Sequence, residues 1–504
     1  MLILLTFIIY QTMGFQPVNL DIMNKRLKYF AGISILGIAL ISTVFHYPVY
    51  IADALTLEIL PDYDIRISVW RILFEPIIGI MLFFNRSIFA LTEIQYVLVW
   101  LFAIFIGYII YRIIVTKDAQ AKKKLIISQI VNLPIAVGLL FTFFLLIIFI
   151  PLPNNTIINN SSNSVLVTTH THSQYSHDGL ISQKGLWKWH KRNGFDAFFI
   201  TDHNNHDKTL DFVNAQRNNE FPMEPLVMCG EEFSGSNHLS LLGLKRKFST
   251  RGYSDAMAID STRANQGAVI ANHWFDGENN SMEFYRNLGV DGFEIENTAL
   301  EKTYDRKIYI KIKDYCESNK LIMNGGLDFH GYGNVCSLWN AFDIPGWHKL
   351  DSNSKEEAIL NIIRTRDQDK LKVLLYKDRS YYEKNNLFIR PVFTVFNYFR
   401  TLNTYQVISW AFWILFVTYI YMQISGKTEL MKKIDPDKIV PIKGVIGAIF
   451  MLALSFVYYN QATFLTGTDN DVYKEYSTLL FYVGLVFLFY SAIVAWFRIF
   501  RSSK

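Results

Sequence analysis

Apolar residues are distributed unevenly along this chain. Long uninterrupted runs occupy both ends, whereas short runs separated by polar stretches occupy the middle. A helix of roughly 20 apolar residues is long enough to cross a bilayer. The pattern predicts membrane-spanning helices over residues 29–50, 94–113, 126–150, 406–424, 440–459 and 477–497. We therefore expect a polar middle domain carried between two membrane regions.

One apolar segment, residues 68–84, is ambiguous because it contains Arg71 and Glu75. Charges inside a span are costly and often functional. Residues four apart can also pair on one helical face, so a paired interfacial or re-entrant helix is an equal alternative. The sequence leaves open whether 68–84 spans the membrane. It also leaves open whether the chain starts at Met1 or Met23, since a second basic-then-apolar stretch begins at Met23.

The distribution of Lys and Arg predicts the orientation in the membrane. Loops 112–124 and 425–443 and the C-terminal end are basic, which favours the cytoplasmic side for all three. Loop 460–476 is acidic and falls on the opposite side, together with the middle domain. The basic residues at 25–28 also favour the cytoplasm, and they agree with the rest only if 68–84 does not span. We expect a multi-pass protein of the plasma or inner membrane, with its middle domain on the non-cytoplasmic side.

Short apolar runs in the middle of the chain alternate with amphipathic segments. Such alternation predicts a parallel sheet covered by helices, which can close into a barrel. The seven runs are 165–169, 197–200, 226–228, 239–242, 268–270, 292–295 and 321–323. The predicted organisation is a membrane region of about three or four helices (1–153), a polar linker (154–164), the middle domain (165–377), an interfacial connector (378–405) and a membrane region of about three helices (406–504).

Metal-binding side chains gather at the ends of these runs, where β/α barrels place their chemistry. His170 and His172 lie two apart, so they share one face of an extended strand. His238 is an exception, because it precedes its run. Imidazole and carboxylate ligands suit Zn, Mn or Fe, and more than four candidates indicate two or three ions. The candidates are His170, His172, Asp202, His203, Glu231, Glu232, His238, His273, Asp328 and His330.

Composition narrows the possible functions. The net charge is only +5, and most of the excess lies beside apolar segments, so nucleic-acid binding is not indicated. The three cysteines show no CxxC spacing, and buried thiols are the simplest interpretation. Nine of the 11 histidines lie between His170 and His330. For His46, His190 and His348 we expect a structural role.

The motifs of the middle domain resemble those of the polymerase and histidinol phosphatase (PHP) family of metal-dependent phosphoesterases. The resemblance covers residues of about 165–377, less than half of the chain. It is carried by His170-Thr-His172 with Asp178-Gly179, Thr201-Asp-His203, Gly230-Glu-Glu232, His238-Leu-Ser, Asn272-His273 and Gly326-Leu-Asp328-Phe-His330. It implies a distorted seven-stranded β/α barrel, here an α/β domain inserted between α-helical transmembrane segments.

The resemblance also implies the roles of individual residues. The implied metal ligands are His170, His172, Asp178, His203, Glu232, His238, His273, Asp328 and His330. Glu232 would bridge two ions and is favoured over Glu231, as Asp178 is over its neighbour His177. Asp328 could also act as a base toward the attacking water.

These features predict a membrane-anchored, metal-dependent phosphoesterase that cleaves a phosphate mono- or diester with a metal-activated hydroxide. His206 and Lys208, just past a predicted strand end, are candidates to contact the substrate phosphate. The number of membrane spans favours a membrane-near or lipid-linked substrate. Two alternatives are a metal-dependent C–N bond hydrolase and a non-catalytic membrane sensor or transport accessory.

Overall fold

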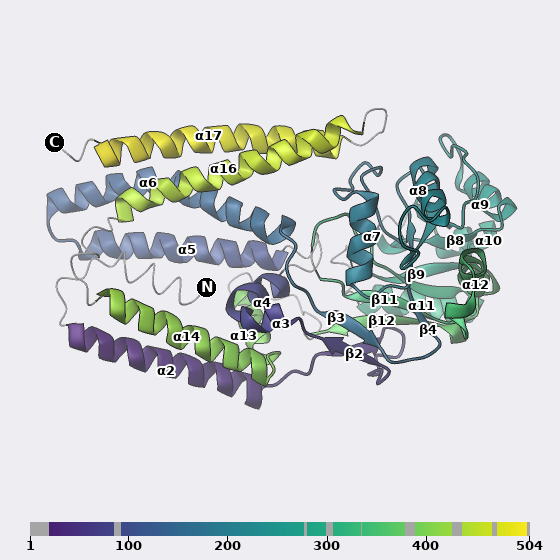
Figure 1. Ribbon diagram of the computed structural model, residues 1–504, viewed down its shortest axis with the longest axis horizontal. Coiled ribbons are helices and arrows are strands. Elements are labelled where there is room, and N and C mark those ends of the chain that lie inside the picture. The colour runs from purple at the N-terminus through teal and green to yellow at the C-terminus, as the bar shows by residue number, and fades with distance from the viewer. Residues whose placement is uncertain are drawn as a thin grey trace.

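The computed structural model describes residues 20–84, 92–276, 280–298, 306–333, 335–378, 389–425, 436–465 and 471–500. Long helices lie side by side at one end of the molecule, and an α/β domain lies at the other (Figure 1). Part of the basic loop 425–443, including Lys427, Lys432 and Lys433, lies outside the described residues. So does Met1, one of the two candidate starts of the chain.

Six helices of the described residues are long and apolar enough to cross a membrane. They are α2 (Leu20–Val44), α5 (Thr92–Val115), α6 (Ala119–Phe149), α14 (Thr404–Ser425), α16 (Pro436–Thr463) and α17 (Val472–Phe500). Each overlaps one predicted span. The first span was predicted to reach residue 50, but α2 ends at Val44. Residues 46–49 precede strand β1 (Tyr50–Asp53), and Pro48 disfavours a helical conformation in the residue before it.

The ambiguous segment 68–84 forms two short helices, α3 (Val69–Leu73) and α4 (Glu75–Phe84). Arg71 Nε lies 3.4 Å from Glu75 Oε2, and both side chains are buried. The Tyr398 hydroxyl donates a hydrogen bond of 2.9 Å to Glu75 Oε1 from helix α13 (Arg390–Arg400). Neither short helix is long enough to span a membrane. Between the basic residues at 25–28 and the basic loop at 112–124, α2 and α5 are the described helices that are long and apolar enough to cross one.

The α/β domain is built on one curled sheet of ten strands, which confirms the predicted fold class but not the predicted number of strands. The strand order is β1-β12-β11-β4-β5-β6-β7-β8-β9-β10. The seven predicted runs are β4 (Ser164–Thr168), β5 (Ala197–Ile200), β6 (Leu226–Ser234), β7 (His238–Leu242), β8 (Ala268–Ala271), β9 (Gly292–Asn297) and β10 (Ile322–Gly326). The additional strands are β1, β11 (Leu338–Asp343) and β12 (Leu371–Lys377), and β2 (Tyr63–Arg66) pairs separately with β3 (Thr156–Asn159).

The expectation of a wholly parallel sheet is wrong at β7, which runs antiparallel to both β6 and β8. Only residues 235–237 separate β6 from β7, and a parallel crossover needs a dozen residues or more. The first residue of β7, His238, therefore lies at the edge where the parallel strands end. This direction explains why His238 precedes its run in the sequence.

The segments that follow the first and last of the seven predicted strands hydrogen-bond to each other. The backbone N–H of Asp328 donates to the His170 carbonyl at 2.9 Å, and that of His172 donates to the Phe329 carbonyl at 2.9 Å. The Asn324 side chain adds a hydrogen bond of 2.7 Å to Thr169 Oγ1. These contacts close the distorted barrel at the end that carries the candidate ligands.

Helices cover both faces of the sheet. Phe198 and Ile200 belong to one buried core, whereas Phe199 and Ile359 belong to another. Because side chains alternate along a strand, consecutive residues of β5 serve different cores, and strands buried on both faces appear as continuous apolar runs. The helices are α7 (Gln183–Arg192), α8 (Asp207–Arg217), α9 (Asp255–Ala264), α10 (Met282–Leu288), α11 (Arg306–Asn319) and α12 (Ser352–Thr365). The three cysteines are free and buried, as predicted.

His190 of α7 is buried in this core rather than near the candidate ligands. Its ring stacks on Phe198 with centroids 4.1 Å apart, and its Nδ1 lies 2.8 Å from the Leu186 carbonyl. Nε2 is buried without a hydrogen-bond partner, so the neutral Nδ1–H form fits. Burial lowers the pKa of His190 to about 3.

We expect this histidine to make the domain less stable in acid. Because its folded pKa lies below its unfolded value, the unfolded state binds the proton first, and stability falls as the pH drops below about 6.5. At pH 5 the loss should be about 2 kcal/mol. In thermal unfolding of the full-length protein in detergent, His190→Phe should lose stability between pH 7.5 and 5 less than wild type does. Equal losses in the two proteins would contradict this assignment.

Candidate metal centre

Eight of the nine predicted ligands fall into three overlapping groups, each able to hold a metal ion. Within each group the donor atoms lie within 4.8 Å of one another. The groups are His172, Asp178, His203 and His330; His170, His172, Glu232 and Asp328; and His203, Glu232 and His238. The ninth, His273, lies beside them, with Nε2 3.2 Å from Glu232 Oε1.

Glu232 lies at the centre of the site, near the C-terminal end of β6, and is buried. Its Oε2 lies 3.2 Å from His170 Nε2, 3.1 Å from His172 Nε2 and 3.4 Å from His203 Nε2. Its Oε1 lies 3.1 Å from His238 Nδ1. Glu232 thus contacts members of every group with one oxygen or the other, as a bridging carboxylate would.

Several histidines present Nε2 to the site because a polar partner engages Nδ1. His172 Nδ1 lies 3.1 Å from Ser176 Oγ, and His203 Nδ1 lies 3.1 Å from Ser234 Oγ. A partner of this kind fixes the ring orientation of a metal-ligating histidine. The rings are therefore held in place by the fold itself.

Glu294 supports His170 in the same way, and sequence reasoning did not identify it. Its Oε1 lies 2.8 Å from His170 Nδ1, and its Oε2 accepts hydrogen bonds from the His273 backbone N–H at 3.0 Å and the Asn297 side chain at 3.1 Å. The sequence feature that could have identified Glu294 is its position as a carboxylate inside the apolar run 292–295, which forms the buried strand β9. Such a carboxylate must face partners within the barrel, because a buried charge is costly without them.

Asp178 and its neighbour His177 differ in position. Asp178 Oδ2 lies 3.0 Å from His330 Nε2 and 3.5 Å from His203 Nε2. The side chain of His177 is 59% exposed and belongs to none of the three groups. The geometry thus brings Asp178, and not His177, into the cluster.

Two residues of the site have unusual backbone conformations. Asp328 has φ of +50° and His273 has φ of +23°, values that residues with side chains rarely adopt. Such strain persists where surrounding contacts hold it, often at functional sites. The Asn297 side chain, which donates to Asp328 Oδ2 at 3.3 Å, is one of these contacts.

The electrostatics of the cluster favour added positive charge. Burial would lower the pKa of His172, but hydrogen bonds with Asp328 and Glu232 outweigh it and raise that pKa to about 10. Burial alone would raise the pKa of Glu232, but the neighbouring His170 and His203 outweigh burial and hold that pKa well below its usual range. Protons on these histidines occupy positions that cations would take, so metal binding should release them. The donor set therefore fits divalent ions.

The acidic neighbour Glu231 points away from the cluster. Its carboxylate contacts His206 Nδ1 and Thr250 Oγ1, and His206 Nε2 lies 3.0 Å from the Arg246 carbonyl. Both ring nitrogens of His206 are therefore engaged by the protein, so its predicted contact with a substrate phosphate is wrong. Lys208 is exposed on α8 and belongs to no metal group.

Comparison with known protein families identifies the domain. Residues 168–270 match the model of the PHP domain, which confirms the predicted family. A comparison with curated proteins found no match.

Among solved structures, one similar protein is a two-domain protein from Bacteroides vulgatus containing a predicted PHP-like metal-dependent phosphoesterase, with 17% identity and a TM-score of 0.32. The match covers 42% of this chain and 65% of that protein. PsfC from Pseudomonas syringae has 15% identity and a TM-score of 0.31, with 52% and 98% of the two chains covered. An amidohydrolase from Chromobacterium violaceum has 12% identity and a TM-score of 0.27, with 38% and 96% covered.

Adjacent carboxylates that point in opposite directions provide a matched test of the site. We expect Glu232→Gln to lower the amount of bound metal, because its oxygens reach all three groups. Glu231→Gln should keep the wild-type metal content, because its partners lie outside the cluster. Elemental analysis of the purified full-length proteins would measure both. Equal metal loss in the two variants would contradict this arrangement.

Proposed function

We propose that this chain, whose residues 168–270 match a PHP domain, is a membrane-anchored, metal-dependent phosphoesterase. The observation that carries the proposal is the sharing of Glu232 by several histidines in three overlapping groups. This arrangement supports two or three ions of Mn, Zn or Fe, since imidazole and carboxylate ligands suit these metals. Such multinuclear sites suit phosphoryl transfer.

The residues of the site have separate tasks in this proposal. Bound divalent ions would supply Lewis acidity and lower the pKa of water. His170, His172, Asp178, His203, Glu232, His238, His273, Asp328 and His330 would hold the ions. The paired histidines and carboxylates orient one another before substrate arrives, which lowers the cost of reorganisation during the reaction. Asp328 is also the candidate to accept the proton of the attacking water, since the surrounding histidines, which outweigh its burial, lower its pKa and keep it ionised.

The positions of the helix ends support the proposed orientation of the protein in the membrane. In Figure 1, α2 begins, α5 ends, α6 begins and α17 ends at the side away from the α/β domain. Basic residues such as Lys25, Arg112, Lys122 and Arg498 belong to these helix ends. Basic segments favour the cytoplasm. The domain would then lie on the non-cytoplasmic side of a plasma or inner membrane.

Contacts between the site and the membrane helices support a substrate held at the membrane. Tyr332 stacks near His330, with centroids 6.2 Å apart, and its hydroxyl donates to the Asp178 carbonyl at 2.9 Å. The same ring packs edge-on against Phe149 at the end of α6, with centroids 6.5 Å apart. One aromatic ring thus separates a candidate ligand from a helix end. Such proximity suits a phosphate ester embedded in, or attached to, a lipid.

The Arg71–Glu75 pair supports anchoring rather than a separate transport or sensing function. The Tyr398 hydroxyl that donates to Glu75 also accepts a hydrogen bond of 3.0 Å from Trp410 Nε1. The pair is buried and tied to α13 and α14. These contacts fix the broken segment 68–84 against its neighbours, which is the role we propose for it.

We expect the full-length protein, purified in detergent and supplied with Mn, Zn or Fe, to hydrolyse p-nitrophenyl phosphate or its diester. The whole chain is used because strand β1 belongs to the sheet of the domain but precedes helices α5 and α6, so a domain cut out after α6 would lack it. His170→Ala and Asp328→Ala should lower turnover by about 100-fold or more, because each removes a ligand. Lys208→Ala, outside the cluster, should retain it.

Other outcomes of this assay would point to the alternatives. Bound metal with turnover of amide or other C–N substrates, and none of phosphate esters, would favour a C–N bond hydrolase. A protein that binds no metal under any condition would instead favour a non-catalytic sensor or transport accessory.

We also expect a preference for substrates held in the bilayer. In vesicles that contain the protein, hexadecyl phosphate should be hydrolysed with a kcat/KM about tenfold or more above that of ethyl phosphate, equivalent to about 1.4 kcal/mol. The comparison isolates the lipid chain, because the two head groups are the same. Similar values for both esters would remove the case for a membrane-held substrate and leave the phosphoesterase intact.

A further inference from the structure

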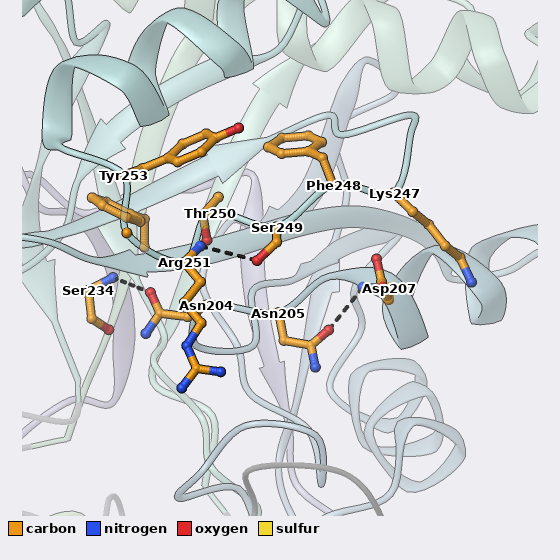
Figure 2. A pocket seen from close by; sticks show the side chains of 12 residues that line it. Asn204, Asn205, Asp207, Ser234, Lys247, Phe248, Ser249, Thr250, Arg251 and Tyr253 are labelled. Carbon is orange, nitrogen blue, oxygen red and sulfur yellow. Dashed lines mark hydrogen bonds between the residues drawn. The ribbon is translucent and has the colours of Figure 1, made fainter.

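A polar pocket of about 570 Å³ adjoins the metal cluster and has no part in holding the ions (Figure 2). It lies between the segment after β5 and the loop that follows β7. Its polar lining includes Asn204, Asn205, Ser234, Ser249 and Arg251. None of these residues belongs to the three metal groups.

The wall of the pocket is continuous with the metal cluster. Ser234 Oγ lies 3.1 Å from His203 Nδ1, and the Ser234 backbone N–H donates to Asn204 Oδ1 at 2.9 Å. The Asn204 backbone N–H in turn donates to the Glu232 carbonyl at 3.0 Å. A ligand in the pocket would therefore touch the direct supports of two candidate ligands, His203 and Glu232.

The loop above the pocket is strongly basic, with Lys245, Arg246, Lys247 and Arg251 within seven residues. Lys247 forms an ion pair with Asp211, 2.5 Å away. Arg251 is exposed and has no ion pair within the part of the chain that the structure describes.

Figure 2 shows the Arg251 guanidinium pointing toward Asn204 and Asn205. The acidic Asp207 lines the other side of the pocket, near Lys247. A guanidinium with neighbouring amide and hydroxyl donors is a typical site for a carboxylate or phosphate.

A buried network fastens this loop to the sheet. Glu231 on β6 contacts Thr250 and His206, and His206 Nε2 reaches the Arg246 carbonyl at 3.0 Å. Glu231 and Thr250 are each 1% exposed, as is His206. The loop is thus held at two points on either side of Lys247, so the backbone that carries Arg251 is fixed beside the pocket.

We propose that this pocket binds a second anionic group of the substrate, a phosphate or a carboxylate, while the ester to be cleaved lies at the metal cluster. The proposal rests on the proposed phosphoesterase function and narrows its substrate class to esters with two anionic groups. Arg251 would be the residue that selects them. Asn204, Asn205 and Ser249 would supply further hydrogen bonds, and Glu231 and His206 would act as positioning residues.

The test compares an alkanediol bisphosphate, such as propane-1,3-diyl bisphosphate, with propyl phosphate on the metal-loaded, full-length protein. Wild type should have a lower KM for the bisphosphate at a similar kcat, and the diol length with the lowest KM would measure the reach between the two sites. Arg251→Ala should raise the KM for the bisphosphate about 10- to 100-fold, the usual effect of losing charged hydrogen bonds. It should leave propyl phosphate unchanged. Lys245→Ala, on the same loop but outside the pocket lining, is the matched control.

Direct binding separates this proposal from the phosphoesterase function itself. Calorimetry with propane-1,3-diyl bisphosphonate and propylphosphonate needs no turnover, and the same loss of bisphosphonate affinity in Arg251→Ala is expected. No bisphosphonate preference in wild type, or an equal effect of Arg251→Ala on both ligands, would overturn the proposal even if hydrolysis is normal. A parallel series with the bisphosphate carried on a lipid chain in vesicles would show whether the second anion belongs to a soluble or a membrane-held substrate.

Discussion

The buried carboxylate of Glu232 is the contact on which the site depends. A charge with 1% exposure must be compensated, because water cannot reach it. Here the compensation comes from histidines on or just after β4, β5, β7 and β8. These strands can reach one carboxylate only if the sheet curls, so the demand for counter-charge and the curvature of the barrel are two aspects of one arrangement. In the same way, the direction of β7 brings His238 to the correct edge.

Much of this organisation could be predicted from the sequence because it involves local, abrupt changes in polarity. Strands β4 to β10 are covered on both faces, so they appear as apolar runs, and the ligands appear where those runs stop. The direction of β7 was missed although Gly235-Ser236-Asn237 carries a hairpin signal. Three residues with turn propensity cannot form a parallel crossover, so loop length, and not strand pattern, held the information.

Other features could not be predicted because they depend on contacts between distant segments. Glu294 lies within a strand and not in a recognisable motif, so only the fold shows that it supports His170. The predicted span 29–50 took in Tyr50, the first residue of strand β1, and no predicted run covered the rest of that strand. The separate tasks of Glu231 and Glu232 follow from side-chain alternation along β6, but the partners that Glu231 meets come from residues 206 and 250. The sequence alone shows neither partner.

Strand β1 has a consequence for how the protein is made. Residues 50–53 pair with residues 374–377 of β12 at the edge of the sheet. Between them in the chain lie two long apolar helices, α5 and α6, and almost the entire α/β domain. A newly synthesised chain must therefore hold β1 without its partner until those helices and most of the barrel have been made. In the proposed membrane topology, the sheet can be completed only when β1 and the rest of the domain lie on the same side of the bilayer, so the edge pairing would couple membrane assembly to domain folding.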